Sequence, residues 1–148
     1  FASKRLGAIR STWIHGLLLM ALVVSSLSSF PNYLSYFNET APVLGGKENL
    51  LGDSNITWGQ DILRLKDYIR KNRIEKIVAL IHFNTPMELD YYGIPRAGSV
   101  ENLERRDPGI YIVDAFNYQG LIRRPEFAWL KNRKPDDRIG GSLLVFKL

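Results

Sequence analysis

The chain has 148 residues, of which 45% are hydrophobic and 24% charged, and this length fits one domain with one extra element. It contains no cysteine, which excludes disulfides, thiolate catalysis and cysteine-based zinc sites. Three of its 20 Lys and Arg precede the first apolar segment, so the rest carries 17 basic residues against 15 acidic ones. This near balance argues against a nucleic-acid partner.

The first predicted element is an apolar helix over residues 13–30, WIHGLLLMALVVSSLSSF. Its 18 residues would cover about 27 Å as a helix, close to the ~30 Å hydrocarbon core of a bilayer. Aromatic residues flank it, as expected at two membrane interfaces, namely Trp13, Phe30, Tyr33 and Tyr36. A cleaved signal peptide with a small-residue site at 26–28 is the alternative, but the length and the aromatic flanks favour a membrane anchor.

Basic residues before this segment predict its orientation. Because Lys4, Arg5 and Arg10 precede it, the positive-inside rule makes residues 1–12 a cytoplasmic leader and residues 31–148 an extracytoplasmic domain. We therefore expect a single span in a cytoplasmic membrane, with the lipid bilayer as partner. The span contains four serines, at positions 25, 26, 28 and 29. Their hydroxyls either bond back to the helix backbone or mark a face on which another helix packs.

The elements after the span follow a strand, helix, strand order. Residues 48–54 can hold a short strand, and residues 60–72, QDILRLKDYIRKN, have the apolar spacing of a helix. Residues 76–83, KIVALIHF, form a nearly continuous apolar run, typical of a central strand covered on both faces. This order predicts a βαβ unit with a right-handed crossover.

The remainder of the chain alternates between turn-rich and apolar segments. Residues 84–109 are rich in turn formers, and a strand is predicted over 109–116. A short helix is expected to begin at Pro125, and residues 141–148 form a closing strand. The predicted fold class is α/β: one N-terminal transmembrane helix followed by a small layered α/β extracytoplasmic domain.

The densest cluster of polar residues is GDSNITWGQD, residues 52–61. Thr57 and Gln60 have the spacing of a capping box for the helix that follows. Asp53 and Asn55 can close the preceding turn, with Trp58 folded over the helix start. The alternatives are a paired-acid site of Asp53 and Asp61, or an anion site at the helix N-terminus; we favour the structural interpretation.

Four segments together resemble a known family: FPNYLSYFNE, DSNITWGQD, DYYGI and EFAWLKNRKPDDRIGGSLLVFKL. They are similar, in the same order, to the C-terminal region of bacterial membrane glycosyltransferases of the protein O-mannosyltransferase-like, GT-C class. Thr57 replaces an acid common in that motif, and Gly141 stands where the family often has Tyr. The motif residues to which the resemblance assigns a structural or binding role are Tyr36, Asn38, Asp53, Asn55, Trp58, Gln60, Asp61 and Tyr92.

The resemblance implies a multi-helix enzyme that takes a sugar from a polyprenyl-phosphate carrier. It also implies a bacterial inner membrane, with residues 31–148 in the periplasm. The acceptor-activating acid of such enzymes lies in a loop between the first membrane helices, and nothing here supplies it. We therefore expect no catalytic, cofactor or metal-binding residues, and a domain that does not catalyse alone. Because the sequence starts at Phe1, the chain is expected to be a processed product or part of a longer protein, with the missing N-terminal membrane portion as its partner.

A second function stays open: a non-catalytic accessory subunit that packs on and stabilises a larger membrane complex, such as a photosynthetic or respiratory one.

His15 fits a membrane interface and His82 a core position better than metal or pigment ligation. Tyr91, Tyr92 and Trp129 can stack on sugars but are more typical of a core. The basic stretch 123–138 is a solvated face or contacts anionic lipid.

Overall fold

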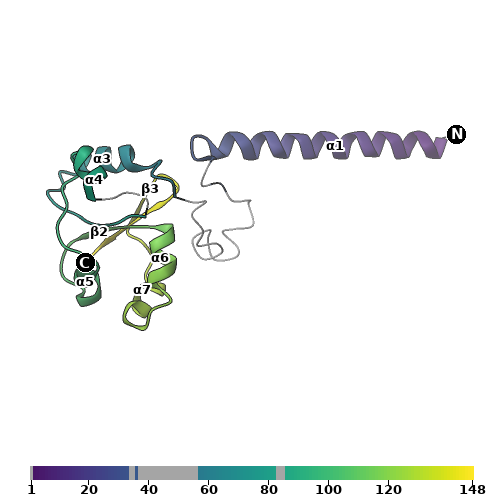
Figure 1. The fold of residues 1–148 in the computed structure, drawn as a ribbon. Helices are drawn as coiled ribbons and strands as arrows, with labels where there is room; N and C mark the ends of the chain where they lie inside the picture. Colours follow the sequence, from purple (N-terminus) through teal and green to yellow (C-terminus); the bar gives the residue numbers. More distant parts are fainter. Residues whose placement is uncertain (1, 34–35, 37–56, 83–85) are drawn as a thin grey trace. The chain divides into compact units, whose positions relative to one another are not determined.

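The structure, a computed structural model, describes residues 2–33, 36, 57–82 and 86–148 (Figure 1). The chain divides into two compact units, Phe1–Tyr33 and Leu34–Leu148. The strand predicted over 48–54, which is the first strand of the predicted βαβ unit, lies outside the described residues.

The first unit consists of one long helix, α1 (Ala2–Ser29). Its segment Thr12–Ser29 is, by length and composition, apolar enough to cross a membrane, a test that a signal sequence near an N-terminus also passes. The hydroxyls of Ser28 and Ser29 both donate to the Ser25 carbonyl, so these two serines do bond back to the helix backbone.

The second unit is built on a four-stranded mixed sheet in the order β1-β2-β4-β3, which confirms the α/β class. β1 and β2 are parallel, and the other two pairs are antiparallel. The strands are β1 (Val78–Leu80), β2 (Ile110–Asp114), β3 (Asp137–Ile139) and β4 (Leu143–Lys147).

The prediction of a central strand over 76–83 was wrong. β1 is only three residues long and lies at one edge, while β2 and β4 form the centre. Its apolar sequence reflects helices on both faces of the sheet rather than two neighbouring strands. On its outer side, the N–H of Ile77 donates to the Pro95 carbonyl and the N–H of Ala97 donates to the Ile77 carbonyl, which protects the start of this edge.

Alternate residues of the strands face two separate hydrophobic clusters, one on each side of the sheet. Ile112 and Val145 face α3 (Ile62–Lys71) and the end of α4 (Pro86–Tyr91). Val113 and Leu144 face the opposite layer (Figure 1), made of α5 (Val100–Arg105), α6 (Ala115–Leu121), η3 (Pro125–Phe127) and α7 (Ala128–Lys131). The domain therefore has three layers.

Most predicted elements exist, with local differences. The helix expected over 60–72 is α3, the strand over 109–116 is β2, and Pro125 begins η3. The last two residues of the predicted strand 109–116 instead begin α6, because Asp114 caps that helix. Short helices α4 and α5 in the turn-rich segment 84–109 were missed, since six residues give too little periodicity to detect.

Candidate functional site at the carboxyl edge of the parallel strands

Polar residues from distant parts of the sequence gather along the side of the sheet where the carboxyl ends of β1 and β2 lie, and we call this side the carboxyl edge. β1 and β2 are parallel, so their carboxyl ends meet at this edge, and β4 begins there because Leu143 pairs with Asp114. In open α/β sheets, ligands bind outside the carboxyl ends of the strands, so this edge is the first place to examine for chemistry. Two buried carboxylates lie there, those of Asp61 and Asp114.

Asp61 immediately precedes α3 and is 1% exposed. Its Oδ2 accepts hydrogen bonds from the backbone N–H of Gly141 at 3.0 Å, the backbone N–H of Ser142 at 3.0 Å and the Ser142 hydroxyl at 2.7 Å. Its Oδ1 accepts from the Arg64 guanidinium at 2.6 Å. Four donors thus satisfy this carboxylate, as a buried charge requires.

The turn between β3 and β4 is shaped around the Asp61 carboxylate. Gly140 has φ +59°, and a Cβ atom at this position would overlap all three atoms of the Asp61 carboxyl group. Glycine adopts this left-handed conformation freely and allows the close approach. Two of the segments on which the family resemblance rests, WGQD and the RIGGS ending, are therefore in direct contact through Asp61.

Asp114 ends β2 and is fully buried. Its Oδ1 accepts from the backbone N–H of Asn117 at 2.7 Å, which caps α6, and its Oδ2 accepts from the backbone N–H of His82 at 2.5 Å. Burial raises the pKa of the Asp114 carboxyl above its ordinary value, and the N–H bonds from Asn117 and His82 offset part of that rise. The Asn117 side chain also donates to the Leu80 carbonyl at 3.2 Å, which ties the end of β1 to α6.

A backbone hydrogen bond connects the residue after Asp114 to the turn that binds Asp61. The N–H of Ala115, next to Asp114, donates to the carbonyl of Ser142 at 2.9 Å, and Ser142 in turn holds Asp61. Beside Asp114, the half-buried His82 ring lies over Phe116 with ring centroids 4.1 Å apart. The expectation of a core position for His82 holds only in part, since the residue follows β1 at the sheet edge.

The predicted capping box of Thr57 and Gln60 does not form. Gly59 has φ +76° and places a turn before the helix, so α3 begins only at Ile62. The Gln60 side chain accepts from the backbone N–H of Trp58 at 2.6 Å, not from that of Thr57. The buried Thr57 hydroxyl has no hydrogen-bond partner among the residues that the structure describes.

The other motif residues have different positions. Trp58 is 58% exposed, so its ring is not buried over the helix start, and Tyr36 is 43% exposed. Tyr92 packs against the cluster under α3, as expected of a core residue, whereas Tyr91 is 84% exposed. Asn38, Asp53 and Asn55 lie outside the described residues, and so does the proposed acid pair of Asp53 with Asp61.

The arrangement at this edge is better suited to holding the fold together than to chemistry. Each oxygen of Asp61 and Asp114 accepts at least one hydrogen bond from within the protein, so both carboxylates act as acceptors that join separate segments of the domain. Within the described ranges, no group of three or more His, Asp or Glu side chains could hold a metal ion.

Sequence reasoning missed Asp114 and Ser142 as members of this cluster. An acid at the end of an apolar strand, followed three residues later by Asn, was the available signal for a helix cap at Asp114. No local signal pointed to Ser142, because its partner is distant in sequence. Comparisons of the chain with protein-family models, curated proteins and solved structures found no match.

Proposed function

We propose that this chain is a membrane-anchored extracytoplasmic domain that serves as the C-terminal part of a lipid-carrier-dependent glycosyltransferase and is not catalytic on its own. The observation that carries this proposal is the state of Asp61, the acid of the family-like WGQD motif. It is buried and bonded by four donors from the same domain, which is the environment of a structural carboxylate.

Two further features support the proposal. The apolar part of α1, with its exposed large side chains, suits a lipid environment, and the basic residues before it favour a cytoplasmic N-terminus. The WGQD turn contacts the RIGGS turn, so both family-like segments contribute to the same structural contact. Together they fix one end of the sheet, so that the domain can present a rigid surface beside the catalytic membrane portion.

Purification from native membranes in mild detergent, followed by intact mass measurement and identification of partners, tests the origin of the chain. A polypeptide of several hundred residues with further spans supports the glycosyltransferase assignment. A mass near 16.9 kDa with stoichiometric membrane partners would instead support the accessory-subunit alternative. Release of the protein by alkaline carbonate would overturn the membrane anchor in both cases.

The structural role of Asp61 is tested separately in the intact enzyme. Asp61→Asn should lower thermal stability, while sugar transfer per folded molecule stays close to that of the wild type. A large loss of transfer in a variant that is still fully folded would contradict a non-catalytic domain. Asp67→Asn, which changes an exposed acid within the adjoining helix α3, is the matched control.

A further inference from the structure

The side of α3 that faces away from the sheet is exposed. Ile62, Leu65 and Ile69 are buried toward the sheet. On the opposite side the exposed positions follow the helical repeat: Leu63, Lys66, Asp67, Arg70 and Lys71. Past the helix end, Arg73, Glu75 and Lys76 are also exposed. We call these residues, together with Trp58, the α3 surface.

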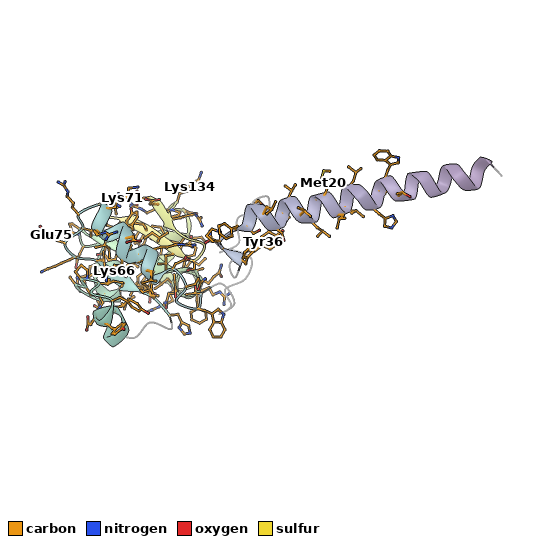
Figure 2. All side chains as sticks on the ribbon, turned by 90° about the horizontal axis from the view of Figure 1, so that it is seen from above. Met20, Tyr36, Lys66, Lys71, Glu75 and Lys134 are labelled. Carbon is orange, nitrogen blue, oxygen red and sulfur yellow. The ribbon has the colours of Figure 1, made fainter. Side chains whose placement is uncertain are left out.

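The positive charge of the domain is concentrated in residues 62–76, the segment that contains α3. Residues 62–76 contain six Lys and Arg and two Asp and Glu, whereas the longer segment 77–148 contains ten against nine. Lys66 and Lys71 stand on α3 (Figure 2). Within the part of the chain that the structure describes, four of the cations form no ion pair, namely Lys66, Lys71, Arg73 and Lys76.

Ordinary helix chemistry explains only part of this charge. Arg70 and Lys71 lie in the last turn, where cations interact favourably with the helix dipole, and Arg70 also pairs with Asp67 at 2.9 Å. Lys66 is in the middle of the helix, and Lys76 lies beyond it. Both side chains are exposed, so their charges can attract an anionic partner outside the domain.

Apolar side chains mark one end of the same surface. Trp58 is 58% exposed and Leu63 is 59% exposed, and both lie at the N-terminal end of α3. Tryptophan, leucine and lysine are residue types that suit a membrane interface, where an indole sits at headgroup depth and cations meet phosphates.

We propose that the α3 surface docks on an anionic lipid surface. This inference rests on the proposed membrane anchor, because α1 and α3 belong to one chain and anchoring keeps the domain at high local concentration beside the bilayer. The cations supply the attraction to lipid phosphates, and Trp58 and Leu63 enter the interface. Docking would fix the orientation of the domain over the membrane.

Single spin labels on the full chain in lipid nanodiscs test the proposal, and the absence of native cysteine makes each label unique. Leu63→Cys places a label on the α3 surface, and Glu104→Cys places one on an exposed site of α5, on the other face of the sheet. Water and oxygen accessibility are measured in neutral phosphatidylcholine discs and in discs that also contain phosphatidylglycerol.

We expect the label at position 63 to lose water accessibility in the anionic discs only, and to recover it at high salt, because salt screens the attraction. The label at position 104 should stay accessible throughout. Neutralising two cations in Lys66→Gln with Lys71→Gln should lower the ratio of docked to undocked molecules about thirtyfold. The matched pair Arg123→Gln with Lys131→Gln, at exposed positions by α6 and α7, should leave that ratio unchanged.

Three outcomes would overturn the inference, and they are distinguishable. Equal accessibility at positions 63 and 104, in a chain that stays in the disc, rejects docking and leaves the anchor intact. Failure of the full chain to enter discs rejects the anchor and with it the docking. Protection of position 63 in native membranes but not in anionic discs would identify an acidic protein surface, rather than lipid, as the partner.

Discussion

The Asp61 carboxylate accepts both the backbone N–H and the hydroxyl of Ser142, a residue 81 positions later in the chain. This pair connects the start of α3 to the start of β4. A segment at one end of the domain sequence is thereby fixed to the segment that closes the sheet.

Asp61→Ala should lower the free energy of unfolding by about 3 kcal/mol, because it leaves buried N–H donors of the β3–β4 turn without an acceptor. Urea unfolding followed by circular dichroism measures the loss. Asp67→Asn, at an exposed ion pair, should change stability by no more than about 0.5 kcal/mol.

A double-mutant cycle isolates the contact itself. Ser142→Ala alone removes one hydroxyl donor and should cost about 1 kcal/mol. Combined with Asp61→Ala it should cost little more than Asp61→Ala alone, because both changes remove the same hydrogen bond. Full additivity of the two effects would show that this bond contributes nothing to stability.

Gly140→Ala should destabilise the domain by at least about 2 kcal/mol, since a Cβ there meets the Asp61 carboxylate and the backbone has φ +59°. Gly120→Ala is the matched control. A Cβ at Gly120, within α6, meets no atom within 4 Å, so alanine should stabilise the helix by about 0.5–1 kcal/mol. Equal effects of the two substitutions in thermal unfolding would contradict the proposed fit of the turn around Asp61.

Asp114 and Asp136 should show opposite pH dependence. Burial raises the pKa of Asp114, so the folded state binds a proton more tightly than the unfolded state does. The contribution of Asp114 to stability therefore grows as the pH falls from the raised pKa of the folded state to the ordinary pKa of an aspartate. The hydrogen bond from the Lys147 backbone N–H lowers the pKa of Asp136, so its contribution is present above the ordinary value and lost as pH falls through its folded pKa.

Unfolding experiments across the acid range, on wild type, Asp114→Asn and Asp136→Asn, measure these contributions. The stability advantage of the wild type over Asp114→Asn should increase on acidification, and its advantage over Asp136→Asn should decrease. Parallel changes for both variants would mean that the two carboxyl groups do not differ in environment as described.

Tyr68 should ionise late in an alkaline titration. Burial, followed by a hydrogen bond with Asp137, raises the pKa of Tyr68 to about 12. Because the folded state favours the neutral phenol, the stability that Tyr68 contributes below pH 10 should be lost as pH rises toward 12. Phenolate absorbance should show a late step that Tyr68→Phe reduces and that substitution of the exposed Tyr91 by Phe leaves in place.

Local patterns in the sequence were sufficient for the main elements. The apolar run of α1, the helical spacing of α3 and the short apolar strands β2 and β4 are each encoded by neighbouring residues, so periodicity and turn formers predict them. The start of α3 was placed too early, because the Thr57 and Gln60 spacing matches a capping box while the left-handed Gly59 turns the chain before the helix.

The sequence by itself determined the α/β class, the apolar N-terminal helix and the segments that form β1, β2 and β4, whereas β3 was not predicted. The tertiary structure alone decided that β1 lies at the edge, that Asp61 meets Ser142, and that Asp114 holds the end of β1 to the start of α6. A carboxylate has the same covalent structure in any sequence context. Whether it is a reactive acid or a structural acceptor depends on the donors that surround it, and those donors are brought together only by pairing of distant chain segments.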